Sequence, residues 1–172
     1  MLEIIQTYWL YFLVGQYPNG PLGGLVLTVL LASCALVLAL PLGIAFGLAR
    51  LSPWRWLRWP VTALVYAVRG VPLLMVVFWA YFFLPSVTGV KTDQFSTMLI
   101  ALVVFDAAYL AEIVRAGVQG LPRGQAEASR ALGLSYARTM RLVLLPQALR
   151  SMLPSLVNQF VSTIKETSLG YI

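Results

Sequence analysis

The feature that most constrains this chain is a long apolar run from Leu22 to Ala49, which contains no charged side chain and ends at Arg50. A helix needs ~20 predominantly apolar residues to cross a bilayer, so this run is long enough to cross with some tilt. Pro41 lies inside the run and predicts a kink. The whole chain is 60% apolar and only 10% charged, against about 25% charged in an average soluble protein. We therefore predict an all-α integral membrane protein.

Three later apolar segments predict further crossings, so residues 1–172 form a single domain with four membrane helices. The second crossing covers residues 61–84 and is interrupted at residues 69–72, where an arginine is followed by Gly, Val and Pro. A charge beside Gly and Pro is costly in lipid, so this face should line protein or water. The third crossing covers residues 97–114, and the fourth starts within residues 151–172.

Residues 115–150 give the orientation of the chain, because they carry many arginines and a single acidic residue, Glu127. Positively charged loops stay on the cytoplasmic side, so this segment is predicted to be cytoplasmic. Counting back three crossings places the N-terminus outside. Residues 1–21 lack a basic start and a cleavage site, and their aromatic side chains favour a helix at the outer membrane interface.

The composition excludes several classes of function. The chain has no histidine and a single cysteine, Cys34, so it offers no disulfide framework, no Cys/His zinc site and no Cys–His nucleophile pair. It also lacks the glycine-rich loop with Lys-Ser/Thr that cradles nucleotide phosphates. The net charge of +6 comes from arginines beside apolar segments, which is the pattern of membrane topology and not of nucleic-acid binding.

The cytoplasmic segment has its own local pattern. A helix is predicted over Gly120–Leu132, and Gly133 stands where a helix C-cap belongs. A second short amphipathic run follows, with Arg138 and Arg141 on its polar side, and Pro146 opens the next element. Two interpretations are open: a solvated connector lying on the lipid headgroups, or a docking surface for a soluble partner.

The spacing of this segment resembles the cytoplasmic loop of permease subunits of bacterial ABC importers. That loop carries Glu-Ala-Ala, three residues, Gly, nine residues, Ile, one residue, and Leu-Pro. This chain departs mildly from that pattern at two positions, where Ser129 stands in place of the second Ala and Val143 in place of Ile. The residues that the resemblance assigns to coupling with an ATPase are Glu127, Ala128, Gly133, Leu145 and Pro146.

Two other stretches resemble permeases for polar amino acids, the group that carries histidine, glutamate, glutamine and arginine. They are residues 69–74, Arg-Gly-Val-Pro-Leu-Leu, and residues 165–169, Lys-Glu-Thr-Ser-Leu. Residues 78–81 and 106–109 look closest to the glutamate/aspartate members. Arginine, histidine and cystine permeases remain the alternative.

The resemblance implies a type I ABC importer permease fold with a cytoplasmic coupling helix in the bacterial inner membrane. A complete chain would have five crossings, since related permeases continue for about one more. The implied partners are an ABC ATPase subunit dimer, a periplasmic amino acid-binding protein, a second permease subunit, identical or paralogous, and the lipid bilayer. ATP and magnesium would bind to the ATPase, so this chain is expected to bind no cofactor and to catalyse no reaction.

Polar side chains within the predicted crossings are candidates for the substrate path, because a zwitterion needs partners of both charges in lipid. The candidates are Asp106, Tyr109, Lys165, Glu166, Thr167, Ser168 and Arg69. Some have simpler explanations. Arg69 can extend to the cytoplasmic headgroups, and Lys165 can pair with Glu166 for assembly alone. Glu112, three residues before Arg115, is expected to form an ion pair with it at the interface.

A few crossings cannot enclose a path alone, so two permease subunits should face each other. Small residues at Gly43, Ala45, Gly47 and Ala49 would allow a close helix approach at that interface.

Two other classes of function stay open. An ion-coupled secondary transporter would use its intramembrane charges for protons or sodium, and its uptake would survive ATP depletion. A structural membrane subunit would not need Lys165 and Glu166 at depth.

Overall fold

The computed structural model describes residues 2–89 and 93–171, and these residues form helices joined by turns. An isolated backbone bridge joins Gly15 to Leu22. In chain order the elements are α1 (Leu2–Val14), α2 (Gly24–Leu51), α3 (Arg55–Arg69), α4 (Leu73–Thr88), α5 (Gln94–Gln119), α6 (Arg123–Ala131), α7 (Tyr136–Thr139), the π-helix η1 (Met140–Leu144), α8 (Leu145–Ser151), α9 (Leu153–Glu166) and the 3-10 helix η2 (Thr167–Tyr171).

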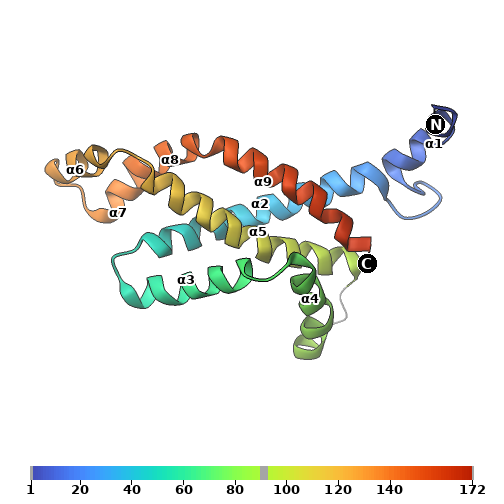
Figure 1. Cartoon of the computed structure of the whole chain (residues 1–172), viewed down its shortest axis with the longest axis horizontal. Coiled ribbons are helices and arrows are strands. Elements are labelled where there is room, and N and C mark those ends of the chain that lie inside the picture. The colour runs from blue at the N-terminus through green and yellow to red at the C-terminus, as the bar shows by residue number, and fades with distance from the viewer. Residues whose placement is uncertain (1, 90–92, 172) are drawn as a thin grey trace.

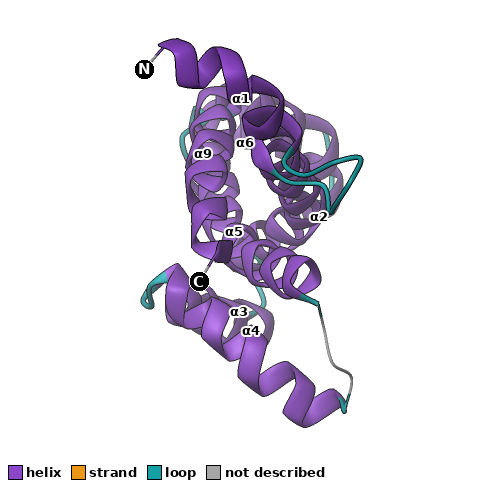
Figure 2. Cartoon of the chain, turned by 90° about the vertical axis from the view of Figure 1, so that its right-hand side faces the viewer, coloured by secondary structure: helices purple, strands orange, loops and turns teal. Residues whose placement is uncertain are grey.

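The helices lie along one long axis. Helices α2, α5 and α9 follow this axis, α6 and α7 lie at one end of it, and α1 and the carboxyl end of the chain lie at the other (Figure 1). Seen from the end, α3 and α4 lie on one side of α5, while α2 and α9 lie on the other (Figure 2). Helix α5 is therefore the centre of the bundle, and its buried residues include Leu102, Leu110 and Val114.

Helices α2 and α5 confirm the predicted first and third crossings. Both are long and apolar enough to cross a membrane. They approach closely where α2 carries glycines. A Cβ built on Gly47 would lie 2.7 Å from the Cβ of Val114 and 3.0 Å from the carbonyl oxygen of Ala111, while one on Gly43 would collide with Leu110.

The predicted dimer stripe is therefore wrong at two of its four positions. Gly43 and Gly47 are buried against α5 of the same chain, and only Ala45 is exposed. Two helices whose backbones approach closely need small residues at the contact, whether they belong to one chain or to two. The glycines of α2 do mark such a contact, but the helix that they contact is α5 of the same chain.

The interruption predicted at residues 69–72 is confirmed, because two helices stand in place of one over residues 61–84. Helix α3 ends at Arg69, α4 begins at Leu73, and their axes are bent by 103°. Pro72 has no backbone N–H and disfavours helical geometry at the residue before it. Its extended conformation, with ψ 145°, lets it serve as the N-cap of α4. The two helices would count as one crossing only if the bent pair is a single broken span.

The region of the predicted fourth crossing is divided among α8, α9 and η2. Helix α8 ends at Ser151, and α9 starts at Leu153 with Pro154 in its first turn. Helix α9 has 14 residues and then tightens into the 3-10 helix η2. Among residues 2–89 and 93–171, two helices meet the length and apolarity of a crossing, and a third does so if α3 and α4 are taken together.

Candidate functional site

The predicted coupling helix is present as α6 and ends as the sequence predicted. Gly133 follows the C-cap with φ +76°, a left-handed conformation that glycine adopts without strain. Its N–H donates to the carbonyl of Arg130 at 2.9 Å, and the N–H of Leu134 donates to the carbonyl of Ser129 at 3.1 Å. This pair of bonds is a Schellman motif, which satisfies the last carbonyls of the helix.

Space is not what requires glycine at position 133, because a Cβ built there would have no atom within 4 Å. The positive φ is the constraint, because residues with a Cβ adopt it only with strain. Helix α6 starts at Arg123 and not at Gly120, which instead caps α5.

The three residues Glu127–Ser129 divide between the two faces of α6. Glu127 and Ala128 are exposed, and no ion pair joins Glu127 to another described residue. Ser129 is buried, and its hydroxyl donates to the carbonyl of Gln125 at 2.7 Å. An exposed carboxylate on a short helix at the end of the bundle is available to a partner.

The remaining residues predicted to take part in coupling lie where this segment returns to the bundle. Leu145 and Pro146 start α8, directly after the π-helix η1. The side-chain amide of Gln147 donates to the side chain of Gln125 at 3.3 Å, which ties α8 to α6. An apolar cluster of Val118, Met140, Leu144 and Ala148 holds the segment against α5, with Leu48 and Leu51 of α2 packed beside it.

A second polar centre gathers three arginines around Glu112. The carboxylate accepts from Arg50 of α2 at 2.6 Å, forms an ion pair with Arg115 one turn later, and lies 3.6 Å from the guanidinium of Arg69 at the end of α3. The predicted pair with Arg115 is confirmed. The other two partners come from distant parts of the chain, so Arg69 is paired within the protein.

Aromatic rings complete this centre. The guanidinium of Arg69 lies over the ring of Tyr109, 4.9 Å from its centroid, and that of Arg50 lies over Tyr66 at 5.2 Å. Such contacts between cations and ring faces are attractive, and more so when water is excluded. The structure thus brings together two predicted path residues, Arg69 and Tyr109.

Asp106 forms a separate, enclosed centre between α5 and α9. It is fully buried, and its carboxylate accepts from the side-chain amide of Gln159 at 2.8 Å and from the hydroxyl of Thr163 at 3.0 Å. Sequence reasoning missed both partners. Their spacing of four places them on one face of a helix, which was the available signal.

The residues at the end of α9 do not pair as one alternative expected. Lys165 is exposed, and the described residues show no ion pair between it and Glu166. The hydroxyls of Thr167 and Ser168 donate at 2.7 Å to the carbonyls of Ile164 and Lys165, at the helix end. One carboxylate oxygen of Glu166 is buried without a hydrogen-bond partner.

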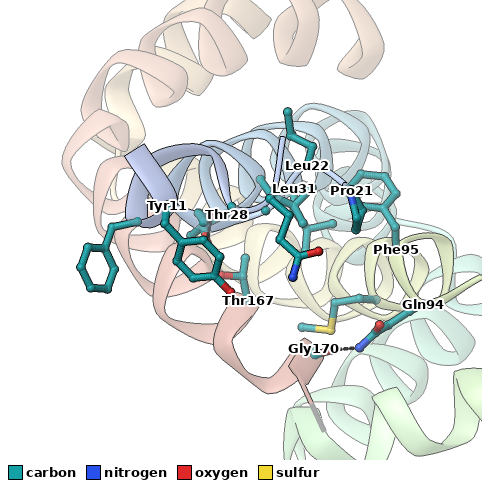
Figure 3. A pocket seen from close by; sticks show the side chains of 16 residues that line it. Tyr11, Pro21, Leu22, Thr28, Leu31, Gln94, Phe95, Thr167 and Gly170 are labelled. Atoms are coloured by element: carbon teal, nitrogen blue, oxygen red, sulfur yellow. Dashed lines mark hydrogen bonds between the residues drawn. The ribbon is translucent and has the colours of Figure 1, made fainter. Parts of the chain in front are cut away.

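A cavity of about 630 Å³ opens at the end of the bundle opposite α6. Figure 3 shows Tyr11, Thr28, Gln94 and Thr167 around it, and the amide of Gln94 donates to the carbonyl of Gly170 at 2.6 Å. Thr167 is the only predicted path residue among its lining residues. Across the ranges that the structure describes, no three His, Cys, Asp or Glu side chains gather in a way that suits a metal ion.

Comparisons with known proteins agree with this architecture. Residues 39–172 match the family described as binding-protein-dependent transport system inner membrane component. The chain is 36% identical over 163 residues to the probable glutamine ABC transporter permease protein GlnP of Bacillus subtilis, covering 92% of this chain and 74% of that protein.

A second relative, the inner membrane amino-acid ABC transporter permease protein YhdY of Escherichia coli, is 39% identical over 172 residues. The alignment covers 96% of this chain, which spans about half of that protein, 47%. Among solved structures, the crystal structure of an amino acid ABC transporter with histidines matches with a TM-score of 0.82 at 29% identity, covering 99% of this chain and 74% of that one.

Proposed function

Since the chain belongs to the family of binding-protein-dependent transport system inner membrane components, we propose that it is the permease subunit of an ABC importer for polar amino acids. The observation that carries the proposal is the exposed helix α6. It lies beyond the membrane helices at one end of the bundle, ends in a Schellman motif at Gly133, and presents the carboxylate of Glu127, for which the described residues offer no ion pair. A short, firmly anchored helix of this kind suits the groove of a soluble partner.

In this proposal the chain binds no nucleotide itself. Two ABC ATPase subunits bind ATP and magnesium, and their closure moves α6 of this chain and of a second permease subunit. A periplasmic binding protein delivers the amino acid to the outer mouth. We propose that α6 is cytoplasmic and that α1 is periplasmic, and the arginines of residues 115–150 support this orientation by the positive-inside rule.

The proposed substrates are polar amino acids, with glutamate, aspartate or glutamine preferred. The relatives described above support this class, because one is named for glutamine and the other for amino acids in general. The proposed path uses Arg69, Tyr109 and Asp106 inside the bundle. At the end of α9 it uses Lys165, Glu166, Thr167 and Ser168.

The coupling role of α6 is tested by Gly133→Asp and Glu127→Lys. We expect both variants to reach the membrane in normal amounts but to lose most substrate-stimulated ATP hydrolysis and uptake. Asp at position 133 would add a Cβ where φ is positive and a negative charge at the carboxyl end of α6, where the helix dipole disfavours it. Lys at position 127 reverses the exposed charge. The measurements are ATPase activity and uptake in proteoliposomes that contain the full transporter and its binding protein.

Gly124→Asp is the matched control for Gly133→Asp. Gly124 lies in the first turn of the same helix and has no left-handed φ, and a Cβ at this position would have no atom within 4 Å. An acidic residue there is favourable to the helix dipole, so coupling should be kept. Normal ATPase stimulation in Gly133→Asp and Glu127→Lys would contradict a coupling role for α6.

The substrate path is tested with the charge-neutralising variants Asp106→Asn and Glu166→Gln. Each keeps a side-chain oxygen that accepts hydrogen bonds, so folding should be preserved. A charge-assisted hydrogen bond to substrate contributes about 1.5–3 kcal/mol, so we expect at least tenfold weaker apparent affinity in uptake assays at matched membrane abundance. Asp93→Asn, at the exposed N-cap of α5, is the control, since asparagine caps helices as well as aspartate. Unchanged affinity and specificity in both variants would exclude these carboxylates from the path.

A further inference from the structure

The cluster of Arg50, Arg69 and Arg115 around Glu112 carries a surplus of positive charge. Three guanidinium groups from α2, α3 and α5 surround one carboxylate, and no other acidic side chain among the described residues forms an ion pair with them. Asp106, the nearest acidic residue along α5, accepts its hydrogen bonds from α9 instead. Charge in a membrane protein that is not balanced within the fold marks a functional site more often than a structural one.

Some guanidinium nitrogen atoms of this cluster donate no hydrogen bond. The side chain of Arg50 is only 2% exposed, and the Nε atoms of Arg50 and Arg69 are buried without a hydrogen-bond partner. Arginine offers five donors in a fixed plane, which suits two parallel bonds to a carboxylate. The cluster can therefore bind a further anionic group without losing the pair between Arg50 and Glu112.

Arg69 is the member best placed to change partners. Its distance to Glu112 is 3.6 Å, against 2.6 Å for Arg50, and its side chain is 31% exposed. It lies at the bend between α3 and α4 and rests on the ring of Tyr109. A guanidinium that is held on one side by a ring and only loosely by a carboxylate can turn toward an incoming anion at small cost.

We propose that Arg69 and Tyr109 bind the carboxylate group shared by all amino-acid substrates, and that Glu112 is the built-in competitor that occupies Arg69 when no substrate is present. The proposal rests on the proposed function and identifies one part of its path. Recognition of the main-chain carboxylate would be common to glutamate, aspartate and glutamine, so it does not depend on which of them is carried. Substrate arrival then replaces the carboxylate of Glu112 by the carboxylate of the substrate as the anion that faces Arg69.

The experiment measures binding to the complete permease–ATPase complex in nanodiscs, without the binding protein. Radiolabelled glutamate and glutamine are the probes, and each is displaced by the unlabelled amino acid or by its α-carboxamide, which lacks the carboxylate charge. The wild type should bind one of the probes and should discriminate at least tenfold against the amide. Arg69→Gln should bind at least tenfold more weakly and should lose the discrimination, while Glu112→Gln should bind severalfold more tightly.

Arg58→Gln is the matched control, because Arg58 is an arginine of the same helix for which the described residues show no ion pair. It should behave as the wild type. Arg69→Gln leaves Arg50 and Arg115 on Glu112, so its folding is expected to be intact, and monodisperse purification checks this. The result that overturns the proposal is unchanged affinity and discrimination in Arg69→Gln, or an equal loss in Arg58→Gln.

A lipid headgroup phosphate has the same chemistry and is the alternative occupant. Nanodiscs of phosphatidylcholine alone and with phosphatidylglycerol separate the two sources: amino-acid binding that disappears with phosphatidylglycerol would overturn the proposal in favour of lipid.

ATP-dependent uptake in proteoliposomes with the binding protein tests the proposed function independently. If the wild type imports amino acids but Arg69→Gln keeps its discrimination, only the role of Arg69 fails. If the wild type neither binds nor imports any of them, both fail.

Discussion

Replacement of Glu112 by alanine is expected to destabilise the protein by about 3–5 kcal/mol, because it leaves a buried charge without its partner. Arg50 is almost completely enclosed and has Glu112 as its ion-pair partner at 2.6 Å. Arg69 and Arg115 would also face each other and Arg50 without an intervening carboxylate. The measurement is the unfolding midpoint of the purified transporter in detergent, together with the amount of folded protein in the membrane.

Two further variants test whether the missing carboxylate causes the loss of stability in Glu112→Ala. Glu112→Gln keeps a hydrogen-bond acceptor for Arg50 and should lose less stability than the alanine variant. Arg55→Ala removes an exposed charge for which the described residues show no ion pair, and surface changes of this kind are usually within about 0.5 kcal/mol. A Glu112→Ala protein as stable as Arg55→Ala would mean that the cluster does not hold α2, α3 and α5 together.

Replacement of Gly47 by leucine is expected to have the second large effect, since it would push α2 away from α5. The new Cβ would lie 2.7 Å from the side chain of Val114 and 3.0 Å from the carbonyl of Ala111. Overpacking usually costs about 1–3 kcal/mol, and here the obstacle includes backbone that a rotamer change cannot move. We expect a marked loss of folded protein, measured by fluorescence-detected size exclusion.

Ala45→Leu is the control, because Ala45 is exposed on the same helix. It adds the same apolar side chain without entering the contact with α5, so the protein should accumulate normally. If Gly47→Leu also accumulates normally while Ala45→Leu disrupts the complex between permease subunits, the interpretation of the small residues as a dimer surface would be correct.

The sequence predicted those features that local chemistry determines. The uncharged run became α2, and Gly133 became the residue after a helix end because glycine adopts positive φ readily. The interruption after Arg69 was also visible, but Gly, Val and Pro determine only that a helix stops. The angle of 103° between α3 and α4 depends on what each helix packs against.

Only some contacts of the two polar centres, around Glu112 and Asp106, could be predicted from the sequence. Glu112 and Arg115 are one helical turn apart, so their pair could be predicted. Arg50 is 62 residues from Glu112 in the sequence, and Gln159 is 53 residues from Asp106. No periodic pattern connects such positions, and an uncharged glutamine in a membrane helix attracts little attention. These partners become visible only when tertiary packing brings the helices together.

The hydroxyl of Tyr136 donates to the backbone carbonyl of Leu51 at 2.7 Å, and so connects α7 to the last residue of α2. Leu51 directly follows Arg50 in the chain, and Arg50 binds the carboxylate that Arg69 also faces. A displacement of α7 must therefore either break this bond or pull the end of α2 with it. In the second case a displacement of α7 reaches the proposed carboxylate site through Leu51 and Arg50. If the proposed ATPase partner moves this segment, the same movement would also control release of the substrate.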